Sequence, residues 1–289
     1  MTGRSTPAQG GVTDDPIRIG TMLYTLVEPH RGHQVEYNRW YERDHFYAGC
    51  QIGAYNFAGA RFVCTAPLKE LRFPDAGTGV GPGAGPEPLV ADAQTGSYLG
   101  VYYVLDGHHD EWNRWAVDQV NVLHAAGRMF DRRDHVHTGL YRFEWEHRRH
   151  EDGVPAELTL DHRFPGMVSV FVEPSPGVTT EQVGAWYRGE YLPSVLPGSP
   201  AATVLAFSPL PLLADAPGDV PRSEQLDQRV LLLWFLDEGP PRSWDALFAG
   251  QPGALSSAGL GQVKWASPFV GTVPGTDTYT DQLWSSPVR

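Results

Sequence analysis

The chain has 289 residues, of which 41% are hydrophobic and 11% aromatic, and its formal net charge at pH 7 is -12. A negative surface repels the phosphate backbones of nucleic acids and the headgroups of anionic membranes, which excludes both as expected partners. The two cysteines, Cys50 and Cys64, lack the spacing of a thiolate metal site and suit a reducing compartment, so we expect a soluble cytoplasmic protein without a disulfide.

The N-terminal residues 1–15 are small and polar and indicate a disordered lead-in rather than an export signal. In the first half, alternating apolar residues predict strands and helical periodicity predicts helices. In chain order the predicted elements are a strand over 17–26, a helix over 32–49, strands over 54–65 and 97–107, a helix over 110–130 and a strand over 135–145.

A Gly- and Pro-rich run over 73–96 interrupts this order and is predicted to be a long loop. Its length would allow it to act as a lid over a pocket, although a disordered insert would have the same composition. The segment GVGPGAG within it lacks the strand, turn and helix of a dinucleotide-binding loop, so we reject that interpretation.

The second half repeats the order of the first. Its predicted elements are a strand over 166–174, a helix over 179–196 capped by Thr179 or Thr180, strands over 201–210 and 228–237, a helix over 243–259 interrupted near Pro252, and a strand over 261–269. The motif RWYERDH aligns with AWYRGEY, and YVLDG aligns with WFLDE. We infer two duplicated domains, 16–150 and 151–271, followed by a tail, 272–289, whose Trp284 is expected to dock on the body.

A βαββαβ unit forms a four-stranded antiparallel sheet with both helices on one face. The other face needs a cover, which two fused copies supply by packing sheet to sheet. The predicted fold class is therefore α+β, with two tandem ferredoxin-like domains. This order, the duplication and the helix motif W-Y-x-x-D/E-H resemble the dimeric α+β barrel superfamily, particularly EthD-like proteins, as a tandem fusion.

The resemblance implies a barrel within one chain and a pocket between the sheet and its helices. The superfamily includes cofactor-free polyketide cyclases, quinone-forming monooxygenases, lactone isomerases and haem-binding peroxidase-like enzymes. The resemblance therefore predicts the fold but does not single out one reaction.

The first helix carries the candidate site. At about 100° per residue, one helix face would carry Tyr37, Trp40, Tyr41 and Asp44, with His45 at its edge. A buried carboxylate needs a partner, and Arg61 on the neighbouring strand is one candidate. An ion pair of that kind would give Asp44 a structural role, which is the alternative to a catalytic one.

The two copies differ in their histidines. Glu190 keeps the acid of Asp44, whereas Tyr191 replaces His45 and Ser256 aligns with His124. An acid kept in both copies is architectural, while imidazoles confined to one copy indicate chemistry that only this copy performs. We therefore place the active pocket in residues 17–148.

A neutral imidazole near pH 7 can accept and return a proton without a cofactor. The leading prediction is a cofactor-independent small-molecule enzyme, with His45 or His124 as base, Asp44 orienting it, and Tyr41 and Tyr103 as hydrogen-bond donors. The predicted substrate-binding residues are Tyr37, Trp40, Tyr103, Arg61, Trp115 and His137, together with Trp112. Such aromatic walls suit an aromatic or polyketide-like substrate, and cyclisation, isomerisation, lyase chemistry and oxygenation all stay open.

Two other function classes remain. One is a non-catalytic binding protein whose pocket sequesters the same compound. The other is a metal- or haem-dependent enzyme: the HVH motif would place His135 and His137 on one strand face, with His124 as a third ligand, and haem needs one proximal histidine and a large pocket. We expect no organic cofactor, and a homodimer with a contact through the tail is left open.

Overall fold

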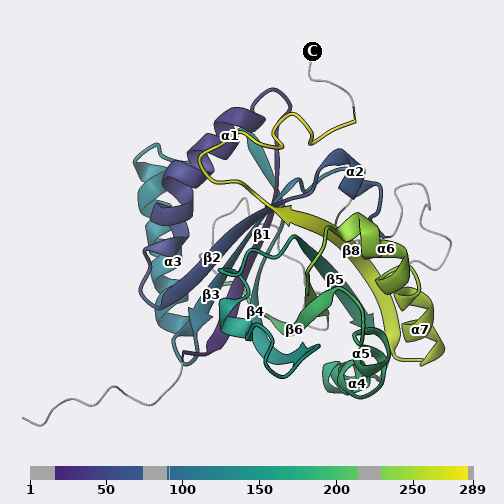
Figure 1. The fold of residues 1–289 in the computed structure, drawn as a ribbon. Coiled ribbons are helices and arrows are strands. Elements are labelled where there is room, and N and C mark those ends of the chain that lie inside the picture. The colour runs from purple at the N-terminus through teal and green to yellow at the C-terminus, as the bar shows by residue number, and fades with distance from the viewer. Residues whose placement is uncertain (1–16, 74–89, 91, 214–228, 286–289) are drawn as a thin grey trace, which may run out of the picture.

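The computed structural model describes residues 17–73, 90, 92–213 and 229–285 (Figure 1). The first-half elements are β1 (Ile19–Pro29), α1 (Gln34–Trp40), the π-helix η1 (Tyr41–Gln51), β2 (Asn56–Val63), α2 (Ala66–Lys69), β3 (Tyr98–Leu105), α3 (His109–Ala125) and β4 (Arg133–Arg148). The second-half elements are η2 (Ala156–Leu158), β5 (Gly166–Pro174), α4 (Thr180–Trp186), the π-helix η3 (Tyr187–Tyr191), α5 (Leu192–Val195), β6 (Ala201–Leu210), β7 (Val230–Leu236), α6 (Pro240–Leu247), α7 (Gln251–Ser257) and β8 (Gly261–Gly271).

Each predicted strand and helix has a counterpart in this order. The predicted lead-in and most of the 73–96 loop, with its suggested role as a lid, lie outside the described residues. No helix in the described ranges is long and apolar enough to cross a membrane.

The strands close into one antiparallel barrel in the order β1-β3-β2-β8-β5-β7-β6-β4. Each half contributes the four-stranded sheet of a ferredoxin-like unit, and the helices lie outside the barrel, α1 and α3 over the first half and α4 to α7 over the second (Figure 1). The predicted fold class is confirmed: the chain forms a dimeric α+β barrel within itself. The narrower EthD-like assignment stays a prediction.

The barrel interior is a packed apolar core to which both halves contribute. Its largest members include Tyr24, Tyr103, Tyr141, Phe171, Phe207, Phe235 and Trp265. The link between the halves adds Leu160 and Phe164 to the same cluster. Burying one such side chain stabilises a fold by roughly 1.5–3 kcal/mol, so this shared core holds the halves together.

The two seams between the halves are unequal. Strands β4 and β6 pair over eight residue pairs, whereas β2 and β8 pair only at Phe62–Gly271 and Val63–Val270. Further along β8, Ala266 instead exchanges two backbone hydrogen bonds with Phe73, of 2.8 and 3.0 Å. The barrel is therefore closed by continuous strand pairing at one seam, whereas part of the other seam lacks direct pairing between β2 and β8.

The first helix differs from the α-helix predicted over 32–49. Regular α-helix ends at Trp40, and Tyr41–Gln51 form a π-helix. The second half does the same at its aligned motif, where α4 gives way to η3. Thr179 is the N-cap of α4 and forms a capping box with Gln182.

The C-terminal tail lies across the outside of the first half, in yellow in Figure 1. Leu283 is fully buried, and the Trp284 Nε1 donates to Glu28 Oε1 at 2.8 Å. The buried Lys69 ammonium donates to the carbonyl of Leu283 at 3.0 Å. These contacts fix the tail on the body as far as residue 285.

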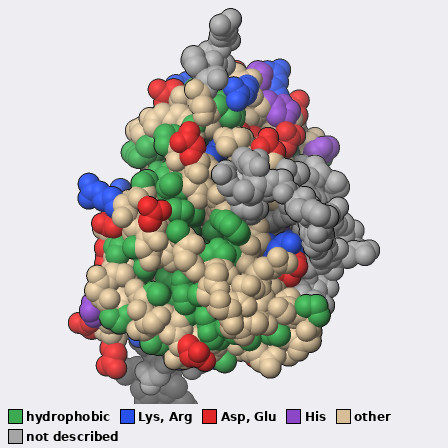
Figure 2. All heavy atoms as spheres, turned by 90° about the vertical axis from the view of Figure 1, so that its right-hand side faces the viewer, with side chains coloured by type: hydrophobic (Ala, Val, Ile, Leu, Met, Phe, Trp, Pro, Cys, Tyr) green, Lys and Arg blue, Asp and Glu red, His purple; other side chains and the backbone are tan. Residues whose placement is uncertain are grey.

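The surface that carries α6 and α7 is partly apolar. Hydrophobic side chains gather in the middle of this face, and Asp and Glu side chains lie around them (Figure 2). Both cysteines are buried and free.

Candidate functional site

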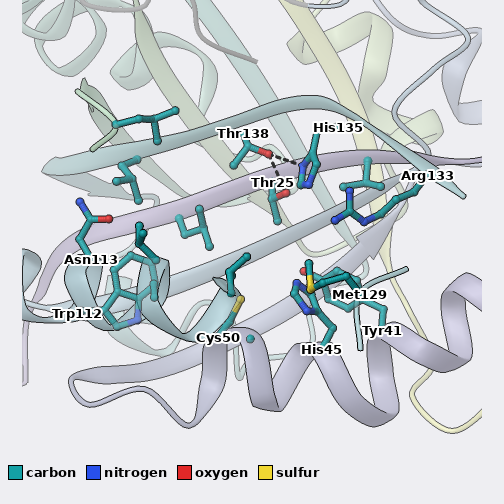
Figure 3. A pocket seen from close by; sticks show the side chains of 18 residues that line it. Thr25, Tyr41, His45, Cys50, Trp112, Asn113, Met129, Arg133, His135 and Thr138 are labelled. Atoms are coloured by element: carbon teal, nitrogen blue, oxygen red, sulfur yellow. Dashed lines mark hydrogen bonds between the residues drawn. The ribbon is translucent and has the colours of Figure 1, made fainter. Parts of the chain in front are cut away.

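A cavity of about 120 Å³ lies between the first-half sheet and the helices η1 and α3 (Figure 3). We call it the helix-face cavity. Its walls are mostly apolar, and its polar or ionisable lining residues are Thr25, Tyr41, His45, Cys50, Asn113, Arg133, His135 and Thr138. Apart from Leu212, the lining residues come from the half in which the candidate pocket was predicted.

The π-helical winding decides which residues of η1 face the cavity. Hydrogen bonds from i to i+5 put more residues into each turn than an α-helix has. Tyr41, His45 and Gly49, spaced by four, consequently share the inner wall. Asp44, which α-helical spacing placed on that face, does not line the cavity.

The position of the His45 ring depends on aromatic packing and on the space left by a glycine. Its ring stacks on Trp40 at 4.6 Å between centroids and meets Tyr41 edge-on at 5.3 Å. A Cβ on Gly49 would lie 2.6 Å from His45 Cε1, closer than real contacts allow, so glycine at this position makes room for the ring.

The His45 imidazole is neutral and has no hydrogen bond to any residue that the structure describes. Its Nδ1 is buried without a partner, and no described residue bonds to the ring. Burial lowers the pKa of His45 to about 3, and the positive charge of Arg133 acts in the same direction. An imidazole of this kind is unprotonated at neutral pH and has a lone pair free to take a proton.

Several other polar groups of the cavity form hydrogen bonds. His135 Nδ1 lies 2.9 Å from Thr138 Oγ1, which lies 3.0 Å from Thr25 Oγ1. The Tyr41 hydroxyl is 2.8 Å from that of Tyr102. Burial raises the pKa of the Cys50 thiol to about 12, so Cys50 is protonated and is no nucleophile here.

The second half repeats the aromatic frame without the imidazole. Tyr191 stacks on Trp186 at 5.0 Å and meets Tyr187 edge-on, as His45 does with Trp40 and Tyr41. The Tyr191 hydroxyl then donates to the carbonyl of Leu247 at 3.3 Å. The stacking geometry belongs to the architecture of both halves, whereas the unpartnered base belongs to the first half.

Asp44 has a different partner from the one predicted. Arg128, 84 residues further along the chain, holds it in a forked ion pair in which Nε lies 3.2 Å from Oδ2. The Asp44 side chain is 31% exposed, so the pair is a surface one. The proposed ion pair with Arg61 is wrong, because Arg61 instead donates to Asn38 Oδ1 at 3.0 Å and lies over the Tyr41 ring.

His124 is exposed in the last turn of α3 and does not line the helix-face cavity. The helix turns Trp112, Val117 and Leu123 inward, which leaves His124 on the solvent side. The geometry therefore contradicts its predicted role as a base.

A β-bulge separates the two histidines of the HVH motif. Val27 pairs with His135 and Leu26 with His137, so Val136 is skipped and the two rings lie on opposite faces of the sheet. His135 lines the helix-face cavity, while His137 points into the barrel, with Nε2 2.6 Å from the Tyr141 hydroxyl. The predicted shared face is wrong, and the described residues contain no group of three or more His, Cys, Asp or Glu that could hold a metal ion.

The remaining predicted residues surround the site without lining it. Tyr103 faces the barrel core, with its hydroxyl 2.9 Å from Thr159 Oγ1. Tyr37 is buried among aromatic rings, and Trp40 stacks on the His45 ring. Trp115 packs against Gly53. Of the aromatic residues predicted for the walls, Tyr41 and Trp112 line the cavity.

Sequence reasoning missed several lining residues. These are Thr25, Gly49, Asn113, Met129, Arg133 and Thr138. The spacing of four from Tyr41 through His45 to Gly49 is the one local signal that could have found Gly49. The strand residues are visible only once the bulge in β4 is known.

Haem does not fit the helix-face cavity. Its macrocycle needs a large pocket beside an axial ligand. The space beside His45 is about 120 Å³, similar to the roughly 150 Å³ of an engineered cavity that accepts a single benzene ring. The cavity as formed admits about one aromatic ring.

No family model matches the chain, and no curated protein matches it. Among solved structures, the chain is similar to a proposed monooxygenase from Fusobacterium nucleatum, with 5% identity, coverage of 88% of this chain and 93% of that one, and a TM-score of 0.45. An anthrone oxidase-like protein has 10% identity, coverage of 94% and 100%, and a TM-score of 0.48. A haem-binding protein from Thermus thermophilus has 9% identity, coverage of 90% and 94%, and a TM-score of 0.41. Likeness at this distance carries no statement about the activity of this chain.

Proposed function

We propose that the helix-face cavity binds a small aromatic molecule with an acidic proton, and that His45 removes this proton without an organic cofactor. The observation that carries the proposal is the His45 ring itself: it lines an apolar cavity, is neutral, and has no hydrogen bond to the described residues. A structural histidine in a core is normally hydrogen-bonded, as His137 is to Tyr141.

In this reaction the proton passes from a carbon or oxygen of the substrate to a ring nitrogen of His45, and the electron pair stays on the substrate. The anion that forms lies beside the new imidazolium and near the guanidinium of Arg133, which lines the same cavity. Apolar walls strengthen both attractions because little water screens them. Burial disfavours a lone imidazolium, so the charge pair forms together or not at all.

The fate of the anion determines the reaction class. If His45 returns the proton to a different atom, the result is an isomerisation or a cyclisation. If the anion reacts with O2, the result is a cofactor-free oxygenation. Tyr41 stays protonated, because burial raises its pKa well above the usual range, and it can serve only as a neutral neighbour of the substrate.

Hydrogen–deuterium exchange of phenylacetone in D2O, followed by proton NMR, tests the proton-removal step directly. This probe has one aromatic ring and acidic C–H bonds next to a carbonyl. We expect the protein to accelerate exchange, and His45→Ala to lower that acceleration about 100-fold or more, as expected for loss of a general base. Ala116→Phe, which fills the cavity, should also abolish it.

The control variant is His124→Ala, whose side chain is exposed and does not line the cavity; it should exchange the probe at the parent rate. Equal exchange by His45→Ala and the parent would refute the assignment of the base. Binding of the probe without exchange would instead favour the non-catalytic alternative, a protein that sequesters its ligand.

A further inference from the structure

A second, larger cavity of about 520 Å³ opens where β2 and β8 diverge. We call it the seam cavity. The segment 159–165 between the two halves lines it, as do residues 270–274, which span the end of β8 and the start of the tail. Residues of β2 and η1 complete much of the remaining wall. Its volume falls within the range of small-molecule sites, which is roughly 300–1,000 Å³.

The helix η1 separates the two cavities. Tyr41 and His45 line the helix-face cavity, whereas Phe46 and Tyr47 line the seam cavity. None of the described residues lines both cavities. A ligand of the seam cavity is therefore independent of the proton-transfer proposal.

Aromatic side chains form much of the seam cavity wall. They are Phe46, Tyr47, Phe62, Phe164, Phe235 and Tyr279. Tyr47 is 53% exposed, which leaves its ring available to a ligand. The walls suit an aromatic ring.

Arg61 gives this cavity a positive charge that no carboxylate in the described part of the chain neutralises. Its side chain is 8% exposed and lies 4.4 Å over the Tyr41 ring, with Nη1 bonded to Asn38. The Nη2 is buried without a hydrogen-bond partner, and no described carboxylate forms an ion pair with Arg61. A buried cation without a counter-ion is costly, and an anionic ligand would supply the missing charge.

Glu42, also in the lining, has one carboxylate oxygen to which no described group donates a hydrogen bond. Its Oε2 accepts from the backbone N–H of Gly275 at 3.1 Å, but its Oε1 is buried with no hydrogen bond, and the nearest cation, Arg43 Nε, is 3.8 Å away. A ligand hydroxyl could donate to this oxygen. At the rim, the exposed Arg163 and Asp161 carry opposite charges and add no net preference.

We propose that the seam cavity binds an aromatic carboxylate that carries a hydroxyl group, with the carboxylate recognised by Arg61 and the hydroxyl by Glu42. Guanidinium and carboxylate pair through two parallel hydrogen bonds, which suits the unused donor of Arg61.

Isothermal titration calorimetry with three probes tests the proposal. They are para-hydroxyphenylacetate, its methyl ester, which lacks the negative charge, and para-methoxyphenylacetate, which lacks the donor. We expect the acid to bind the parent protein at least about tenfold more tightly than the ester, since loss of a charge-assisted hydrogen bond has about this effect. The methoxy compound should bind about threefold to tenfold more weakly than the acid.

Variants of the two polar residues connect each ligand group to its partner. Arg61→Met should bind the acid and the ester equally. Glu42→Met, which has no side-chain oxygen to accept a hydrogen bond, should bind the hydroxy and methoxy compounds equally. Arg242→Met removes an exposed arginine of α6 and should keep the parent acid-to-ester ratio. Arg61→Met should fold, because it removes a buried charge without a counter-ion.

Two cavity-filling variants locate the probe. Ala60→Phe fills the seam cavity and should abolish binding, while Ala116→Phe fills the helix-face cavity and should leave it intact. The reverse pattern would overturn the proposal, as would an unchanged acid-to-ester ratio in Arg61→Met. Equal affinity of acid and ester for the parent protein would refute the role of Arg61 even if that variant did not fold.

Discussion

Replacement of His137 by glutamine should make the fold less sensitive to acid. His137 is 5% exposed inside the barrel, where its Nε2 meets the Tyr141 hydroxyl at 2.6 Å and its ring packs on Phe171. Burial, assisted by the charge of Arg229, lowers the pKa of His137 to about 3. An unfolded histidine titrates near pH 6.5.

The sign of the effect follows from proton uptake. Between about pH 6.5 and about pH 3 the unfolded chain binds a proton at this position and the folded chain does not, so stability falls as the pH falls through this window. Above it, both states are neutral and the full stability is present. Each pH unit inside the window changes the unfolding free energy by about 1.4 kcal/mol per histidine.

Urea denaturation at about pH 6.5 and at about pH 4.5, followed by circular dichroism, measures the difference. Over these two units His137 accounts for about 2.5 kcal/mol of lost stability, and His137→Gln should lose that much less than the parent. The variant itself should be about 1–3 kcal/mol less stable than the parent at neutral pH, because glutamine replaces the contact with Tyr141 imperfectly. An equal acid-dependent loss in variant and parent would mean that the His137 ring reaches water or is protonated in the fold.

Three further outcomes follow from the packing. Gly49→Ala should displace the neighbouring imidazole, since a Cβ there would lie 2.6 Å from its Cε1, and should slow phenylacetone exchange at least about tenfold without loss of secondary structure by circular dichroism. Asp44→Asn should leave that exchange at the parent rate and cost less than about 1 kcal/mol in urea unfolding, because it breaks only a surface ion pair. Lys69→Met removes the ammonium that donates to Ser97 Oγ at 2.7 Å and to the Leu283 carbonyl at 3.0 Å, so residues 280–285 should exchange their amide hydrogens faster by mass spectrometry, whereas unchanged protection would show that the tail is held by other contacts.

The periodicity of the chain was sufficient to predict the strands. The runs of β5, β6 and β7 are mostly apolar and are bounded by turn residues, so local pattern and tertiary burial agree. The alignment of the two aromatic motifs also holds in three dimensions, because Trp186 and Tyr191 stack as Trp40 and His45 do. Local sequence and its repetition therefore predict the barrel.

The side-chain directions near the site could not be predicted in the same way. The same apolar sequence is compatible with an α-helix and with a π-helix. The change to π-helical winding after Trp40 leaves Asp44 outside the cavity wall and His45 within it. A single skipped residue in β4 separates His135 from His137. Both are choices of backbone geometry set by distant packing, which the periodicity of one chain does not encode.

The duplicated barrel has a consequence for how such a protein can change over time. In a dimer of identical chains, every substitution occurs in both subunits. A substitution that opens space in the cavity wall of one subunit therefore opens the same space in the other. Here the Tyr191 hydroxyl donates to the carbonyl of Leu247, while His45, in the matching position, has no hydrogen bond to a described residue. Fusion of the two copies in one chain removes this symmetry constraint. One half can then serve as a rigid support, while the residues that line the cavity of the other half can change independently.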